Sequence, residues 1–384
     1  MSNISLTLKV PLFFISLVFS AVVNSSSLVK TEPDKYLGYL KAENFSALNV
    51  ELMRLITQYQ SDFHVEQELD LALEQVSASD PLLEEKLTKW VDEIPNSVAA
   101  HLVRGSYYAN VAWTKRGTRF YSQTTQKQID GMQYYFQKAY ADLEEAKSLD
   151  PNLVHARIYE MDVFKSYGEH ERIKALKDEA LKLNPYSYTA RRDYIWTVTP
   201  RWGGSMAQIE EEVKAARPYY DKNPRLKLLE AELYRELGQQ ALTANQNKQA
   251  FEYFSKALDY EVSGYNYDKR GYALARLGDF ASALQDFDKA VGMSPFYSEA
   301  YANRGGAKYN LKDYQGAIED YSKALSFDPE NADILSFRGE CYLLIGDPES
   351  ALADLQKAVT LFPGNKRYKD GLEKAMKAIS PAQS

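Results

Sequence analysis

Apolar residues recur at intervals of three and four along almost the whole chain, with polar residues between them. This spacing places the apolar side chains on one face of an α-helix. We find no run that alternates between apolar and polar residues as a half-buried β-strand requires. The pattern therefore predicts an all-α protein. The clearest helical segments of the first half span residues 36–59, 81–95, 97–114 and 131–149.

The second half of the chain repeats itself. Three segments align without gaps at a period of 34 and end at Pro295, Pro329 and Pro363. Because proline has no N–H to continue a helix, it ends the second helix of each segment. Small residues recur where two helices must cross closely. They are Gly271, Gly305 and Gly339, then Ala283, Ala317 and Ala351, then Ala290, Ala324 and Ala358.

These segments resemble the tetratricopeptide repeat. The resemblance implies a right-handed superhelical solenoid of antiparallel helix hairpins. An earlier, fourth unit keeps the small and aromatic positions but has Glu261 and Val262 in place of the proline. We predict four repeats over residues 231–363, bounded as 231–263, 264–297, 298–331 and 332–365. Residues 365–384 should form a capping helix and tail.

The first half looks like a divergent set of helical hairpins. Pro151 and Pro185 are also 34 apart, with Ala146 and Ala180 five residues before them. The segments "LTKWVDEIPNSVAAHLVRGSYYANVAWTKRG", "ADLEEAKSLDP" and "YIWTVTPRWGGS" resemble the family known as domain of unknown function 4034. The resemblance covers roughly residues 36–224 and implies a helical domain beside tetratricopeptide repeats. It implies no activity.

The N-terminus has the order of a secretory signal peptide. Lys9 precedes an apolar run from Val10 to Val23, followed by small polar residues. The run has 14 residues, fewer than the roughly 20 that span a bilayer. We predict a signal peptide over residues 1–25, cleaved after Ala21 or Ser25, although an uncleaved anchor stays open. The protein is then exported to the periplasm or cell envelope of a bacterium, or secreted.

Composition and motifs exclude several kinds of function. The net charge is −7 and the basic residues are spread along the chain, so nucleic acid is not an expected partner. Cys341 is the single cysteine and the four histidines are scattered, so we expect no disulfide, no metal and no cofactor. Acid pairs such as Glu144 and Glu145 are interpreted as solvated helix faces. We find no catalytic motif and predict that the protein is not an enzyme.

The repeats do offer a candidate binding surface. In the tetratricopeptide register, one face of each first helix lines a concave groove, which in this family binds extended peptides or helices. The groove residues would be Tyr265, Asp268, Tyr272, Arg276, Glu299, Tyr309, Asn310, Asp333 and Glu340. Four acids against one arginine favour a basic or amphipathic segment as partner. Alternatively, these charges only keep an open surface soluble.

A second candidate lies in the first half. Arginine and tryptophan stand beside glycine in two loops, at Trp113 and Arg116 and again at Arg201 and Trp202. The second loop, "PRWGGS" at 200–205, is interpreted mainly as a helix-to-helix corner. There Pro200 should end one helix, the two glycines should permit positive φ, and Ser205 with Gln208 should form a capping box. A ligand-contacting loop remains the alternative.

The leading hypothesis is a non-catalytic exported scaffold that binds another envelope protein. The rival is an enzyme or small-ligand receptor with its pocket in the first half. Self-association through the solenoid ends is a third possibility, and the oligomeric state stays open.

Overall fold

The computed structural model describes residues 34–117 and 124–379. These residues form 19 α-helices joined by turns and short 3-10 helices, without a β-strand among them. The prediction of an all-α helical-repeat protein is therefore confirmed. No helix in these two ranges is long and apolar enough to cross a membrane. The signal peptide predicted over 1–25 lies outside the described residues.

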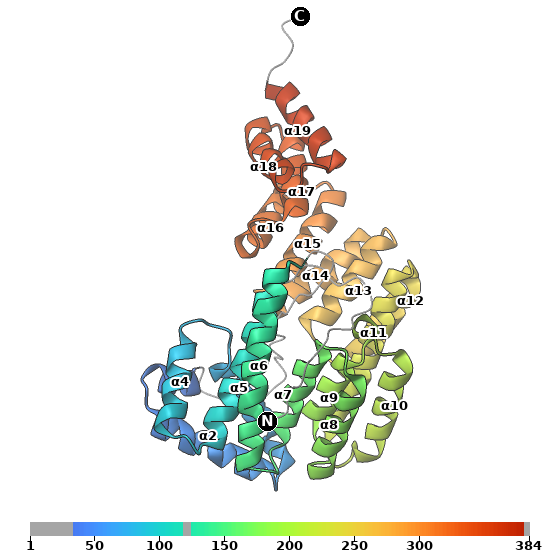
Figure 1. Ribbon diagram of the computed structural model, residues 1–384. Coiled ribbons are helices and arrows are strands. Elements are labelled where there is room, and N and C mark those ends of the chain that lie inside the picture. The colour runs from blue at the N-terminus through green and yellow to red at the C-terminus, as the bar shows by residue number, and fades with distance from the viewer. Residues whose placement is uncertain (1–33, 118–123, 380–384) are drawn as a thin grey trace, which may run out of the picture. The chain divides into compact units, whose positions relative to one another are not determined.

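The chain divides into two compact units, one ending at Leu233 and the other beginning at Tyr234. In the N-terminal unit, most helices pack against the helix that follows them in the chain (Figure 1). Its helices are α1 (Lys35–Lys41), α2 (Phe45–Tyr59), α3 (Glu66–Val76), α4 (Leu83–Glu93), α5 (Val98–Arg116), α6 (Gln126–Leu149), α7 (Val154–Lys165), α8 (His170–Leu183), α9 (Tyr188–Thr197) and α10 (Met206–Ala216).

The C-terminal unit is a stack of helix hairpins followed by one more helix. The boundary between the units falls within α11 (Leu228–Thr243). The helices that follow are α12 (Asn247–Tyr260), α13 (Gly264–Arg276), α14 (Phe280–Met293), α15 (Ser298–Asn310), α16 (Tyr314–Phe327), α17 (Ala332–Leu344), α18 (Pro348–Leu361) and α19 (Lys366–Ile379). The domain and repeat bounds given above remain predictions.

Within each hairpin a glycine lets the two helices touch. A Cβ placed on Gly305 would lie 2.9 Å from the Tyr321 ring and 3.3 Å from the Ala317 carbonyl oxygen. A side chain at this position would push α15 away from α16. Gly271 meets Phe287 in the same way, and Gly339 meets Leu355.

Beside each of these glycines, an arginine of the first helix binds an aspartate of the second with two parallel hydrogen bonds. This two-pronged geometry is the strongest form of an arginine–carboxylate pair. Residues 16 apart are joined in every case. The pairs are Arg270–Asp286 (2.7 and 2.8 Å), Arg304–Asp320 (2.8 and 2.6 Å) and Arg338–Asp354 (2.7 and 2.8 Å). We call this contact the Arg–Asp clamp.

The same clamp holds α5 to α6 in the N-terminal unit. Arg104 donates to Asp142 over 2.7 and 2.8 Å, and a Cβ on Gly105 would lie 2.9 Å from Leu143. The paired residues are 38 apart instead of 16 because both helices are longer. Helix α6 begins at Gln126, five residues before the predicted start, since Thr125 caps it with a full capping box. The hairpin of α5 and α6 is therefore an enlarged repeat hairpin.

The hairpin of α11 and α12 lacks the clamp. Gly238 still approaches Phe254, with a Cβ-to-ring distance of 2.8 Å. Leu237 and Tyr253 occupy the places of the arginine and the aspartate. An ion pair of Arg235 with Glu261 at 2.6 Å instead joins α11 to the residue that follows α12.

Removing the carboxylate of one clamp should lower the free energy of unfolding more than removing a surface carboxylate on the same helix. Asp286→Ala leaves the Arg270 guanidinium partly buried without its partner, so we expect a loss of about 3 kcal/mol in the free energy of unfolding. The control is Asp288→Ala, two residues further along α14. Asp288 is 58% exposed where Asp286 is 5% exposed, so its pair with Arg304 should be worth less than about 1 kcal/mol. Equal losses in urea unfolding would contradict a stabilising role of the clamp.

Candidate functional site

The predicted groove residues lie on the first helices of the repeats and differ in accessibility. Tyr272 is 38% exposed, and Arg276, Asn310 and Asp333 are also exposed. The half-buried members of the set are Tyr265, Glu299, Tyr309 and Glu340.

Asp268 is the exception and corrects the prediction. Its side chain is fully buried, where it accepts hydrogen bonds from the Tyr297 hydroxyl at 3.2 Å and the Asn303 amide at 2.8 Å. Burial raises the pKa of Asp268, against the opposing charge of Lys269. Asp268 joins α13 to α15 and cannot be reached by a partner.

The other groove acids are balanced by cations of the same chain. Lys269 Nζ lies 2.6 Å from Glu299, and Arg367 of α19 lies 3.1 Å from Asp333. Burial raises the pKa of Glu340, which the nearby Arg367 opposes. The groove therefore lacks the excess of free carboxylates that favoured a basic partner. This pairing could not be predicted from the sequence, because the cations come from other turns and from the last helix.

Arg276 is engaged within the protein. Its guanidinium donates to the Leu242 carbonyl at 3.1 Å and to the Asn245 side chain, both in the preceding hairpin. It also lies 5.8 Å from the centre of the Tyr272 ring. The groups that the groove offers to a partner are therefore aromatic, amide and apolar: Tyr272, Tyr309, Asn310 and Leu343.

In the N-terminal unit, three of the four residues predicted as a ligand loop come together. The Trp113 and Trp202 rings meet at 5.4 Å in a T-shaped contact, and the Arg116 guanidinium lies 6.0 Å from each ring. Arg201 is instead exposed, with its Nε 3.3 Å from the Thr199 hydroxyl. The two arginines therefore engage different groups.

Lys165 and Asp162 of α7 complete this cluster. Lys165 lies 4.7 Å from the Trp113 ring and 5.1 Å from the Trp202 ring, and it pairs with Asp162. Asp162 also accepts the Trp113 indole N–H at 2.5 Å. Cations on tryptophan faces are stabilising contacts in their own right. Nothing in the sequence linked α7 to the two loops.

The loop "PRWGGS" is a corner between α9 and α10. Helix α9 ends at Thr197, and Pro200 starts a short 3-10 helix, Pro200–Trp202, instead of ending α9. Gly203 has φ of 86°, as expected, whereas Gly204 is needed for space. A Cβ on Gly204 would lie 2.1 Å from the Val198 carbonyl oxygen.

The predicted capping box at the start of α10 is half formed. The Ser205 hydroxyl accepts from the Gln208 backbone N–H at 3.4 Å. The Gln208 side chain accepts from the Ser205 hydroxyl at 3.0 Å instead of from the Ser205 backbone N–H.

A side chain at Gly204 should therefore destabilise the corner. We expect Gly204→Ala to lower the free energy of unfolding by at least about 2 kcal/mol, because the backbone at Val198, directly after α9, must move. Gly38→Ala is the control in the same unit, since Gly38 lies in α1 with nothing within 4 Å of its Cβ position. It should gain up to about 1 kcal/mol from helix propensity. A Gly204→Ala protein as stable as wild type in urea unfolding would show that the corner tolerates a side chain.

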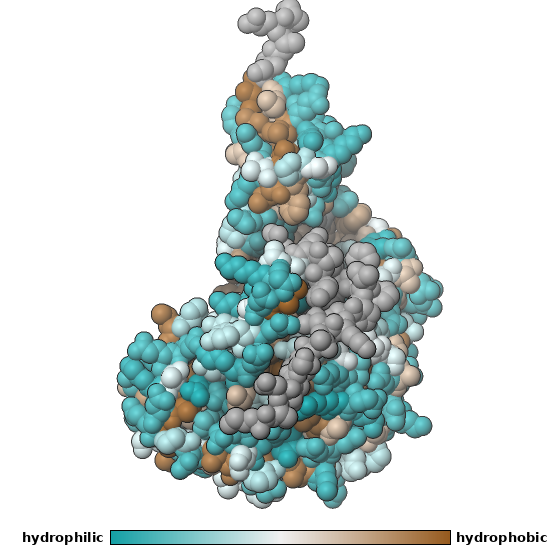
Figure 2. Space-filling view, viewed as in Figure 1, coloured by the Kyte–Doolittle hydropathy of each residue, from teal (hydrophilic) through white to brown (hydrophobic). Residues whose placement is uncertain are grey.

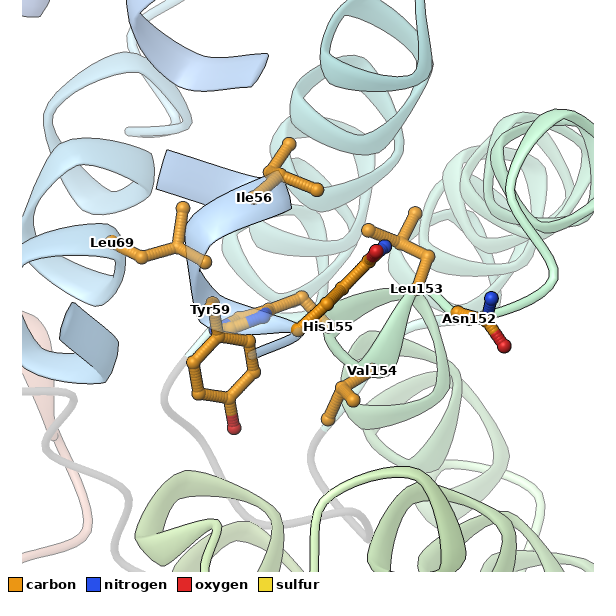
Figure 3. Close-up of a pocket in the computed structure, with 8 residues that line it drawn as sticks. Ile56, Tyr59, Leu69, Asn152, Leu153, Val154 and His155 are labelled. Atoms are coloured by element: carbon orange, nitrogen blue, oxygen red, sulfur yellow. The ribbon is translucent and has the colours of Figure 1, made fainter. Parts of the chain in front are cut away.

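Figure 3 shows a hollow of the N-terminal unit lined by Ile56, Tyr59, Leu69, Leu153 and His155, among others. It has no room for a water molecule. It is a gap in side-chain packing and not a ligand pocket.

Behind this hollow lies a buried polar network centred on Glu66 of α3. Glu66 accepts the Tyr59 hydroxyl at 2.9 Å, the Ser187 hydroxyl at 2.7 Å and backbone N–H groups of Tyr188 and Thr189 at 3.1 and 3.2 Å. It therefore satisfies the first N–H groups of α9. This is a structural role that the sequence did not indicate.

Asp70, one turn further along α3, extends the network. It binds His155 at 3.1 Å and Arg225 at 3.2 Å. Burial raises the pKa of Asp70, but the hydrogen bond from His155 and the charge of Arg225 outweigh it and hold that pKa well below its usual range. The ionised carboxylate thus connects α3 to α7 and to the segment before α11.

A second buried acid, Glu160 of α7, lies against Glu144 and Lys147 of α6. Lys147 Nζ is 2.6 Å from Glu144 and 2.7 Å from Glu160. Burial raises the pKa of Glu160 to about 7, together with the hydrogen bond that the protonated Glu160 donates to Glu144, whose own pKa is lowered. Glu144, interpreted from the sequence as part of a solvated face, is exposed, and it also pairs with Glu160.

This pair should make stability depend on pH. Between the ordinary pKa of 4.5 and the folded value of about 7, only the folded state holds the proton on Glu160. The free energy of unfolding should therefore fall as pH rises through this window, by up to about 1.4 kcal/mol per unit. Glu160→Gln should flatten that slope in urea titrations, whereas Glu179→Gln, at an exposed position of α8, should leave it unchanged. The same slope in Glu160→Gln and wild type would rule out Glu160 as the titrating group.

Within residues 34–117 and 124–379, no three His, Cys, Asp or Glu side chains are placed to hold a metal ion. Cys341 is buried in the core of its repeat, and burial raises its pKa to about 12. A thiol with such a pKa is a poor nucleophile.

This arrangement defines a helical-repeat protein of the all-α class. Two tetratricopeptide-repeat models match residues 269–332 and 309–375, and the model of a domain of unknown function, DUF4034, matches residues 32–178. Residues 269–375 thus match tetratricopeptide repeats and residues 32–178 match the DUF4034 model, in line with the sequence resemblance.

Several solved structures are similar over part of the chain. A crystal structure of MamA protein shares 21% identity over 39% of this chain and 82% of its own, with a TM-score of 0.37. MamA 41-end from Desulfovibrio magneticus RS-1 shares 25% identity over 39% and 91%, with a TM-score of 0.35. YrrB, described as a TPR protein with an unusual peptide-binding site, shares 19% identity over 60% and 97%, with a TM-score of 0.33. A search of curated proteins found no match.

Proposed function

We propose that this protein is a non-catalytic, exported helical-repeat protein that binds another protein in the bacterial cell envelope. The binding surface is the concave face of its tetratricopeptide repeats, and the ligand is a peptide or a helix. The observation that carries the proposal is the match of residues 269–375 to tetratricopeptide-repeat models. Stacked repeats of this kind create an extended concave surface that serves for binding.

The accessible groups of this face suit contacts with a polypeptide. Tyr272 and Tyr309 offer ring faces and hydroxyls, and Asn310 offers an amide. Tyrosine supplies a large contact area with little loss of conformational freedom. Because Glu299 and Asp333 pair with cations of the same chain, apolar contact and hydrogen bonding should select the partner more than net charge does. A net positive charge on the partner is therefore not required.

The groove is tested by recovering partners of a tagged full-length chain from its own cells. Tyr272→Ala combined with Tyr309→Ala should reduce partner recovery about tenfold or more, since buried tyrosines often dominate interfaces. Tyr134→Ala is the control, because Tyr134 is 58% exposed on α6, outside the groove. Unchanged recovery with the double variant would reject the concave face as the site.

Export rests on the N-terminal sequence alone. The mass of the chain recovered from the envelope fraction should correspond to a start after Ala21 or Ser25. A full-length mass in the cytoplasmic fraction would contradict export but would leave the proposed binding groove unaffected.

An enzyme or small-ligand receptor in the N-terminal unit is the second candidate. Its supporting observation is the convergence of Trp113, Arg116 and Trp202. The cations of this cluster already lie on its rings, and Asp162 is shared by Lys165 and Trp113. These contacts indicate that the cluster stabilises the corner at residues 200–205, so the ligand-binding candidate has less support.

A further inference from the structure

We propose that the C-terminal unit has a second docking surface, along the turns that join the two helices of each repeat, and that it binds a basic amphipathic helix. This surface is separate from the concave face and goes beyond the function proposed above.

The first observation is a row of exposed aliphatic side chains. Leu277, Leu311 and Ile345 are 34 residues apart, and each caps the C-terminus of the first helix of a repeat, α13, α15 and α17. They are 51%, 44% and 44% exposed. A single exposed leucine needs no explanation. Three at one position of successive repeats form a continuous row, because the repeats stack on their neighbours.

Exposed apolar residues also occur elsewhere in the C-terminal unit, and Figure 2 shows brown patches over its end. Leu344, next to Ile345 in sequence, is also 51% exposed. Folding of the hairpins does not require apolar side chains at these positions, since they lie outside the core of each repeat.

The second observation is a parallel row of carboxylates. Asp279, Asp313 and Asp347 each follow an aliphatic member of the row by two residues and cap the second helix. Hydrogen bonds from Ser282 and Ser350 hold the pKa of Asp279 and Asp347 below its usual value, so these two aspartates are ionised at neutral pH.

The balance of charge along this edge is negative. Lys312 is the cation within the row, between Leu311 and Asp313, and Glu349 adds a further acid beside Asp347. Arg276 precedes Leu277 and is bound to the preceding hairpin. An apolar row flanked by carboxylates is complementary to an apolar stripe flanked by lysine or arginine.

The spacing of the row fits a helix. Helix α13 contacts α15, and helices in contact lie about 8–10 Å apart, so these neighbouring repeats present their aliphatic side chains at about this interval. A helix rises about 1.5 Å per residue, so a helix lying along the row meets a new aliphatic side chain about every seven residues. The ligand therefore has apolar residues at heptad spacing, the pattern of an amphipathic helix that docks by one face.

The row ends at a polar hollow. The hollow is open and is lined by Leu277, by Asn245 and Gln246 before α12, and by Asn247, Lys248 and Gln249 in the first turn of α12. The end groups of any helix lack partners within that helix, so polar side chains here can bind the end of a docked helix.

The test uses a synthetic peptide of about 21 residues, with leucine at heptad spacing and lysine on both flanks, and an acidic copy with glutamate in place of lysine. The basic peptide should bind the full chain, more weakly at higher salt, and the acidic copy should bind at least tenfold more weakly. No binding of the basic peptide, or equal binding of both, would overturn the proposal.

Two variants locate the site. Leu277→Gln, Leu311→Gln and Ile345→Gln together should weaken binding at least tenfold. Asp279→Asn, Asp313→Asn and Asp347→Asn should also weaken it and keep the caps, because asparagine caps helices as well as aspartate does. If the first variant fails to fold, the second decides. Unchanged binding in the folded variants overturns the proposal.

The groove variant separates this surface from the concave face. Tyr272→Ala with Tyr309→Ala should bind the basic peptide like wild type. Loss of peptide binding in this variant would assign the peptide to the groove and overturn the second surface, while leaving the proposed function intact.

Discussion

The structure depends on how closely the two helices of a hairpin can approach. A glycine removes the side chain at the crossing point, and the Arg–Asp clamp closes beside it. The aspartate is nearly buried in each clamp, so its charge must be met by the guanidinium. Because both halves of this contact recur at one place in the hairpin, every clamped repeat has the same internal geometry. The concave groove and the row of turns that join the two helices of each repeat are regular because the hairpins share this geometry.

The repeats and the all-α class could be predicted because their signals are local. Glycine, alanine and proline at a fixed period describe a hairpin without reference to distant residues. The clamp could have been predicted too, since Arg270, Arg304 and Arg338 directly precede the three glycines. In a sequence, charged residues on an amphipathic helix are normally interpreted as a solvated face. An arginine and an aspartate that pair between the two helices of a hairpin are therefore easily overlooked. Arg104 before Gly105 carries the same signal, with its aspartate much further away.

The candidate sites were less predictable because they depend on pairing between helices. Repeat register placed Tyr272 and Tyr309 on first helices but could not show that Asp268 is buried under Tyr297. Nor could it show that Arg367, near the end of the chain, faces Asp333. In the corner at residues 200–205, the proline and the two glycines indicated a tight turn of the backbone. Only the fold shows that Gly204 meets Val198 and that Trp202 reaches α5 and α7.

The hairpin of α11 and α12 has a further consequence. It keeps the glycine contact but has Leu237 and Tyr253 in place of the Arg–Asp clamp, and its first helix crosses the boundary between the two compact units. In a stacked array, each repeat is stabilised by its neighbours. The least stable hairpin therefore determines where cooperative unfolding is interrupted. Opening of this one hairpin would leave the clamped repeats on its C-terminal side folded. The chain can then lose order at an interior point instead of fraying from its end, so a protease or a chaperone would meet two separate folded bodies joined by an unfolded segment.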